Sequence, residues 1–182
     1  MKRSRNAAPG IVYDPADVSC LLQLPFVVRG PVPDANHGEI VIYYGGWSLK
    51  ELRECRAGQH RMRQDETWYD NKVWKADPGY YRLLLPVPSS NRKNWHEQLA
   101  HLRTIDDAWQ PAAVAIAATA LLVHLTATGN DLIRNDWCRC AELILDGDQA
   151  VLTVSDGRLW VDDSYGNVHR YGGLWLAAAQ KC

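Results

Sequence analysis

The sequence has almost no net charge, which narrows the partners that it can attract. Its 182 residues include 20 lysines and arginines against 21 aspartates and glutamates, so the formal charge is −1. Nucleic acids and anionic membranes bind strongly basic surfaces, and any such contact must therefore depend on a local basic cluster. The length predicts one domain, residues 1–182, in which residues 1–10 form a flexible basic tail.

Clear signals for export or membrane insertion are also lacking. Asp14 and Asp17 interrupt the chain before a signal peptide could form its apolar segment. The uncharged stretch 108–130 is rich in alanine rather than in the larger apolar residues that drive insertion, which favours a buried helix over a membrane span. Five cysteines, an odd number with irregular spacing, are typical of free thiols in a reducing compartment. We therefore expect a cytoplasmic protein without a membrane segment.

The segment that most resembles a metal-binding motif does not have the required histidine spacing. His96 and His101 flank Glu97, but they are five residues apart, whereas the two histidines of a zinc metalloprotease helix are four apart. On a helix this spacing turns the two imidazoles about 140° away from each other. Glu97 fits better as the third residue of a helix that Asn94 caps. We expect no metal ion and no cofactor.

A thiol-dependent enzyme is one alternative function. Cys138 and Cys140 would lie on the same face of a strand, and either could act as a nucleophile if a histidine removed its proton. His169 is the candidate base, and Asp162 or Asp163 could orient it. Small buried hydrophobic side chains are the commoner role of such cysteines.

Aromatic side chains with polar groups are unusually abundant. The sequence contains eight tryptophans and eight tyrosines beside a single phenylalanine. Trp and Tyr are favoured where an apolar surface meets water, at interfaces and in ligand grooves. Many of them gather between residues 68 and 82, where a core role is the alternative. The ligand-binding surface that we predict consists of Trp68, Tyr69, Trp74, Tyr80, Tyr81 and Arg82.

A basic segment, residues 50–63, supports a second alternative, association with nucleic acid. Phosphate contacts need clustered cations, and this segment contains Lys50, Arg53, Arg56, Arg61 and Arg63. Glu51 and Glu54 dilute the cluster, so a solvated helix face explains it more simply. We do not expect nucleic acid to be the main partner.

The first half of the chain has a well-marked helix start. Ser48 and Glu51 have the spacing of a capping box, and the helix should end at Gly58. Apolar runs at 26–28 and 40–44 predict strands before it. Residues 68–88 predict two further strands around a turn at 77–79.

The second half predicts helices followed by strands. One helix is expected at 94–103, and an alanine-rich helix should begin at Pro111 and end before Gly129. Turn signals then separate four apolar runs, which predict a β-meander of about four antiparallel strands. The expected fold is a single α+β domain, with the central alanine-rich helix packed on an antiparallel sheet that includes the C-terminal β-meander.

Four segments resemble parts of other sequences: PGYYRLLLPVPSSNRKNWHEQ, HLTATGNDL, WCRCAE and GLWLAAAQK. The chain is similar in them to uncharacterised bacterial hypothetical proteins, over roughly residues 68–182. This resemblance implies a bacterial origin and brings no activity, cofactor or functional residue. The function that we expect is a non-enzymatic cytoplasmic binding or interaction domain with a small-molecule or protein partner. The thiol enzyme and the nucleic-acid-associated protein are the alternatives.

Overall fold

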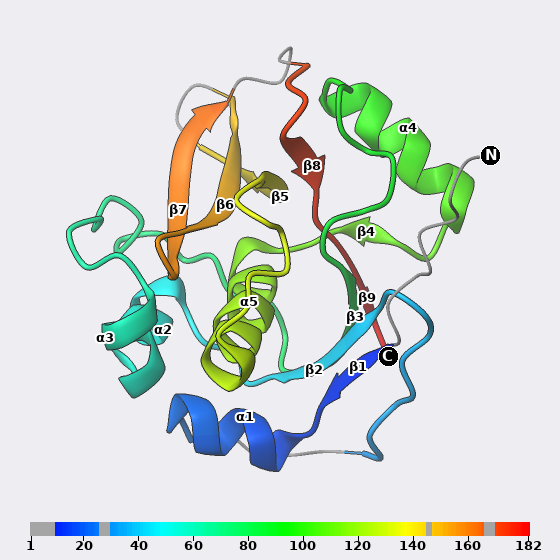
Figure 1. The fold of residues 1–182 in the computed structure, drawn as a ribbon. Helices are drawn as coiled ribbons and strands as arrows, with labels where there is room; N and C mark the ends of the chain where they lie inside the picture. Colours follow the sequence, from blue (N-terminus) through cyan, green and yellow to red (C-terminus); the bar gives the residue numbers. More distant parts are fainter. Residues whose placement is uncertain (1–9, 26–29, 145–146, 166–169) are drawn as a thin grey trace.

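The structure is a computed structural model that describes residues 10–25, 30–144, 147–165 and 170–182, with the backbone alone at 163–165. Figure 1 shows two mixed sheets around a central helix. The helices are α1 (Pro15–Leu22), α2 (Leu49–Glu54), α3 (Arg56–Arg61), α4 (Trp95–Ile105) and α5 (Val114–Thr128). The residues expected to form a strand at 26–28 lie outside the described part of the chain, as does most of the basic tail.

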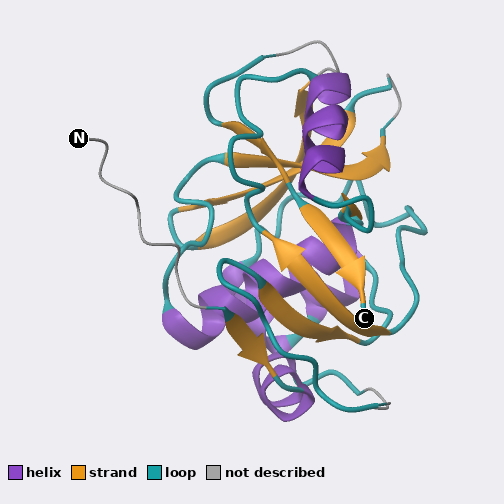
Figure 2. Cartoon of the chain, turned by 90° about the vertical axis from the view of Figure 1, so that its right-hand side faces the viewer, coloured by secondary structure: helices purple, strands orange, loops and turns teal. Residues whose placement is uncertain are grey.

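The first sheet has the strand order β1-β2-β3-β9-β4. These strands are β1 (Ile11–Tyr13), β2 (Ile40–Tyr44), β3 (Gly79–Leu84), β9 (Ala178–Lys181) and β4 (Gln110–Pro111). β1 pairs parallel with β2, and the remaining pairs are antiparallel. The late strand β9 therefore lies inside the sheet, between β3 and β4, and the C-terminus lies at its end (Figure 2).

The second sheet has the order β7-β6-β5-β8. Its strands are β5 (Trp137–Leu143), β6 (Gln149–Ser155), β7 (Arg158–Tyr165) and β8 (Leu174–Leu176). β5, β6 and β7 form the expected antiparallel meander. The prediction was wrong for the fourth strand, because β8 lies at the far edge beside β5 and pairs parallel with it.

Helix α5 lies between the two sheets, as Figure 1 shows at the centre of the molecule. It contacts β2, β5, β6 and β7 as well as α1, α2 and α3. Every residue from Val114 to Leu125 is buried. The helix is apolar on all sides because it is enclosed on all sides. This arrangement confirms the α+β fold with a central alanine-rich helix. Among the described helices, none is both long enough and apolar enough to cross a bilayer.

The start of α5 differs from the prediction. Pro111 lies in β4, paired with Ala178, and the helix begins three residues later. No side chain of its own segment caps this end; instead, the carboxylate of Glu142 on β5 accepts a hydrogen bond from the Val114 amide at 2.7 Å. Such a partner from a distant strand leaves no local sequence signal. The predicted end was correct, since Gly129 caps the helix with a φ of 71°.

The expected helix after Ser48 is in fact two short helices. The capping box of Ser48 and Glu51 is present, but α2 ends at Glu54, and Cys55 is the N-cap of α3, which begins at Arg56. Gly58, predicted to end the first helix, lies inside the second. A Cβ atom at this position would stand 1.8 Å from the carbonyl oxygen of Leu52. The glycine therefore permits a close contact between helices rather than a helix end.

The first strand predicted in 68–88 is absent. Residues 68–71 form a turn and the chain stays irregular until β3 begins at Gly79. Arg53 of α2 donates hydrogen bonds to the Glu66 carbonyl at 2.6 Å and to the Asp70 carboxylate at 2.7 Å. These bonds hold the segment as a loop over α2, and this tertiary contact outweighs the strand preference of its aromatic residues.

A buried polar network joins α4 to the outer edge of the second sheet. The side-chain amide of Gln98 donates to the carbonyls of Ser90 at 3.0 Å and Leu174 at 3.3 Å, and its oxygen accepts from Arg139 at 3.2 Å. Arg139 is fully buried, and burial lowers its pKa to about 10, so it stays charged at neutral pH. The Ser90 hydroxyl accepts from the Leu176 amide at 2.9 Å. Edge strand β8 is thereby covered.

The capping box of α2 predicts a loss of stability in acid. Burial raises the pKa of Glu51, but hydrogen bonds from Lys75 and from the amide and hydroxyl of Ser48 outweigh it and lower the pKa to about 2. A carboxyl group with a lowered pKa stabilises the fold above its unfolded pKa of about 4.3, and this contribution is lost as the pH falls toward 2. Urea unfolding should show the wild type more stable than Glu51→Ala at pH 6, with the gap closing between about pH 4 and pH 2. A gap that does not change with pH would contradict this role.

Candidate functional site

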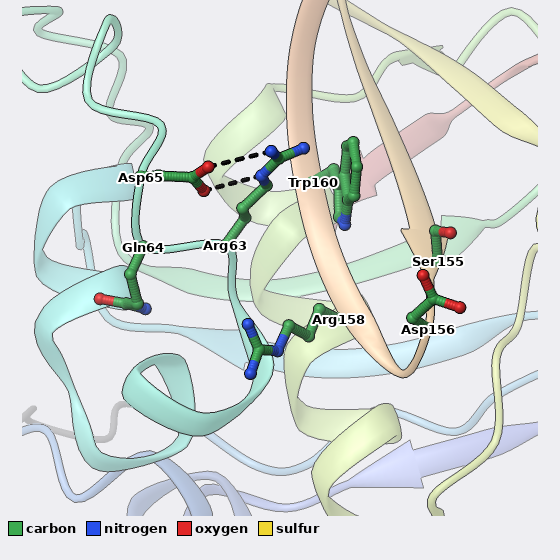
Figure 3. Close-up of a pocket in the computed structure, with 7 residues that line it drawn as sticks. All are labelled: Arg63, Gln64, Asp65, Ser155, Asp156, Arg158 and Trp160. Atoms are coloured by element: carbon green, nitrogen blue, oxygen red, sulfur yellow. Dashed lines mark hydrogen bonds and ion pairs between the residues drawn. The ribbon is translucent and has the colours of Figure 1, made fainter.

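A groove of about 580 Å³ lies beside the tip of the β6–β7 hairpin (Figure 3). It is larger than the cavities beside α3, of about 370 Å³, and beside β1, of about 210 Å³. We call it the Trp160 groove. The residues that line it are Arg63, Gln64, Asp65, Ser155, Asp156, Arg158 and Trp160.

The hairpin determines which side chains face this groove. Asp156 and Gly157 form its turn with φ angles of 52° and 69°, the conformation that Asp-Gly favours between two strands. Leu159 is buried in the core beside α5. Because side chains alternate along a strand, Arg158 and Trp160 lie on the opposite face.

Arg63 forms the other wall and is firmly held. Its guanidinium carbon lies 4.0 Å from the centre of the Trp160 ring, a cation–π contact. The same guanidinium donates to both carboxylate oxygens of Asp65, at 2.7 and 2.9 Å, as Figure 3 shows. The backbone amide of Arg63 also donates to the Leu159 carbonyl at 3.1 Å. The segment after α3 is thus attached to the edge of β7, and the aromatic face is pre-positioned.

A second indole lies across the sheet from Trp160. Thr153 of β6 pairs with Trp160 on one side and with Trp137 of β5 on the other. The two half-buried indoles therefore belong to the same face, two strands or about 10 Å apart. The Thr153 hydroxyl donates to the Asp136 carbonyl at 2.7 Å, which orients the polar group between them.

The groove carries both signs of charge. Arg63 and Arg158 are matched by Asp65 and Asp156. Arg63 is already paired, whereas Arg158 makes no ion pair with any residue that the structure describes. A ligand here can stack on an indole and exchange hydrogen bonds with donors and acceptors. Because the two arginines are balanced by two aspartates, the groove does not favour a ligand with a large net charge.

The structure divides the binding surface predicted from the sequence. Trp68 packs edge-to-face against Tyr69 and Trp74, with ring centres 5.5 and 5.7 Å apart. Tyr69 is buried, and the Trp68 indole donates to the Val161 carbonyl on the edge of β7 at 3.3 Å. These three rings form one cluster between the loop and the core. Trp68 and Trp74 remain half-buried.

The other three predicted residues alternate along β3. Tyr81 is buried in the main core and donates to the Asp77 carbonyl at 2.8 Å. Tyr80 lies on the opposite face, packed against Tyr43 with ring centres 5.0 Å apart. Arg82 lies beside Glu39, at 3.9 Å. The six residues thus do not converge on one surface.

Both candidate thiols are deeply buried. Cys138 and Cys140 have no exposed surface, and burial raises the pKa of each thiol well above its usual value. A thiolate is therefore disfavoured at both positions. Asp162 lies on β7, whereas His169 and the side chain of Asp163 fall outside the described residues. This geometry provides no support for a nucleophile at these positions.

Alkylation with iodoacetamide at neutral pH should separate the cysteines into two classes. The exposed residues Cys20 and Cys182 should react first. Cys138 and Cys140 should react at least about a hundredfold more slowly, because buried thiols become accessible only when the fold opens. Peptide mapping after timed quenching would give the individual rates. Fast labelling of Cys138 or Cys140 in the folded protein would instead favour the thiol enzyme.

The histidines of α4 and the basic segment 50–63 were considered from the sequence as weaker candidates. The ring of His101 lies 2.7 Å from the Pro88 carbonyl through Nε2. Within the described ranges, no group of three His, Cys, Asp or Glu side chains is close enough to hold a metal ion. In the basic segment, Lys50 and Arg53 are paired with Glu54 and Asp70.

Trp160 and Arg158 were not predicted as site residues, although one local signal could have identified them. The Asp156-Gly157 turn places Arg158 and Trp160 on the same face of the second hairpin strand. The approach of Arg63 depends on the packing of α3 against β7 and has no such signal. Comparison of the chain with protein-family models, with curated proteins and with solved structures gave no match.

Proposed function

We propose that the protein is a non-enzymatic binding domain whose ligand occupies the Trp160 groove. The main support is the contact between Arg63 and Trp160 at 4.0 Å, in which Asp65 holds the arginine. Because the side chains of Trp160 and Arg63 are already ordered, little conformational entropy is lost when a ligand stacks against them. The groove volume of about 580 Å³ falls within the range of small-molecule sites.

The chemistry of the groove favours a small polar molecule with a planar ring. The ring would stack on the face of Trp160 that Arg63 does not cover, and its polar substituents would bond to Arg158, Ser155 and Asp156. The balanced charges favour a neutral or zwitterionic ligand. This proposal keeps the aromatic and arginine recognition expected from the sequence but moves it from residues 68–82 to the β6–β7 hairpin.

A fragment screen followed by NMR would test this site. A library of small aromatic compounds should contain binders that shift the indole signal of Trp160, which Trp160→Phe identifies. Trp160→Ala should weaken their binding by about tenfold, the effect of losing one stacking contact.

Trp74→Ala is the matched control, because Trp74 belongs to the surface predicted from the sequence. It should leave the affinity of these compounds unchanged. If the compounds shift the indole signals of Trp68 and Trp74 but not that of Trp160, the ligand site is the surface predicted from the sequence and not the Trp160 groove.

The proposed setting is the bacterial cytoplasm. All five cysteines are free, and the exposed Cys20 and Cys182 are compatible with a reducing compartment. Mass-spectrometric counting of thiols in protein taken directly from cells should find all five reduced. A stable disulfide at either exposed cysteine would contradict this location.

A further inference from the structure

A second groove, of about 370 Å³, lies where three helices meet. We call it the α3 groove. Arg56, His60 and Arg61 of α3 line one side, and Cys20 and Gln23 at the end of α1 face them, with Thr126 from the last turn of α5. The residues that line it include two arginines and a histidine but no aspartate or glutamate.

The structure separates the basic residues of the segment 50–63 into two groups. Lys50, Arg53 and Arg63 each have a carboxylate within 3.9 Å. The side chains of Arg56 and Arg61 make no hydrogen bond and no ion pair with any residue that the structure describes. The two arginines that lack a partner are the two that line the α3 groove. The cations of the segment that have no carboxylate partner are therefore gathered beside one cavity.

Helix stability explains only part of this arrangement. His60 and Arg61 are in the last turn of α3, where cations interact favourably with the helix dipole. Arg56 is the first residue of α3, where the same dipole disfavours a cation. Its position beside the groove thus has no benefit for the helix, and a ligand of opposite charge would account for it.

We propose that the α3 groove binds the phosphate group of a small ligand. Arginine side chains bind phosphate with paired hydrogen bonds, and two of them can share one group. A nucleic acid is less suitable, because a polymer backbone needs a continuous track of cations and the neighbouring ones are neutralised by carboxylates. This site goes beyond the Trp160 groove and does not depend on it.

Titration with inorganic phosphate would test the site in the intact protein. At constant ionic strength, phosphate should shift the ring signals of His60 with a dissociation constant of about 1 mM or below. It should also slow alkylation of Cys20 by iodoacetamide in a Cys182→Ser background, because Cys20 lines the same groove.

Comparing the phosphate affinity of variants would show whether Arg56 and Arg61 form the site. Arg56→Gln combined with Arg61→Gln should weaken phosphate binding by at least about tenfold. Arg103→Gln removes one exposed arginine from α4 and should leave the affinity within about twofold. Thermal unfolding should show that all variants remain folded, which the exposed or half-buried positions favour.

Two results would overturn the proposal. One is the absence of a saturable shift of the His60 ring signals up to about 20 mM phosphate, a concentration far above the expected dissociation constant. The other is binding of a single-stranded oligonucleotide that needs Arg56 and Arg61 while phosphate alone does not bind, which would point to a nucleic-acid surface instead.

Discussion

Gln98→Ala should lower the free energy of unfolding by about 3 kcal/mol. Gln98 is fully buried and connects Arg139 to the carbonyls of Ser90 and Leu174. Its removal deprives a buried guanidinium of an acceptor and leaves the Leu174 carbonyl without this donor. Urea unfolding at pH 7 would measure the loss, with the far-UV spectrum as a check that α4 is still formed.

Two variants control this experiment. His96→Ala changes an exposed residue of the same helix and should cost less than about 0.5 kcal/mol. Arg139→Met removes the buried charge and keeps most of the volume, so adding Gln98→Ala to it should cost clearly less than Gln98→Ala alone. If the two costs simply add, the bond between Gln98 and Arg139 does not stabilise the fold.

Leu121→Ala should destabilise the protein by about 2–5 kcal/mol, because it leaves a cavity in the core that surrounds α5. Leu121 is 1% exposed, and its helix is in contact with both sheets. Ala118→Leu should cost about 1–3 kcal/mol for the opposite reason, since the site has no room for a larger side chain. Leu143→Ala on β5, where the side chain is 59% exposed, should stay within about 0.5 kcal/mol.

Hydrogen exchange offers an independent measure of how completely α5 is buried. Amides between Ala115 and Leu125 should exchange only through global unfolding, because no side of the helix is open to solvent. Their opening free energies should therefore equal the free energy of unfolding measured in urea. Exchange as fast as that of an exposed loop would show that α5 is peripheral.

Local signals in the sequence predicted the features that depend on a few neighbouring residues. The capping boxes at Ser48 and Asn94 and the glycine that ends α5 are examples, because each bond joins residues at most four positions apart. The fold class followed as well, since the alanine-rich run and the late hairpins have distinct patterns. Where two elements only a few residues long share a boundary, as at Cys55, the patterns overlap and the boundary was missed.

The features that were not predicted depend on contacts between distant parts of the chain. The burial of Gln98 has no local signal in the sequence, because only the position of Arg139 explains it. The parallel pairing of β8 and the loop that Arg53 holds have the same origin. In the Trp160 groove, the approach of Arg63 to Trp160 brings together residues almost a hundred positions apart, and no local pattern reveals such a contact.

The place of β9 inside the first sheet has a consequence for synthesis on the ribosome. β3 is made early, yet its neighbour is β9, so roughly 100 further residues must be translated before that edge is filled, about 5–20 s at about 5–20 residues per second. During this time β3 presents unpaired backbone groups and apolar side chains to other chains. The nascent protein should therefore depend on chaperones during a defined late interval of translation, and synonymous codons that slow the stretch between β3 and β9 should increase aggregation without any change in the finished protein.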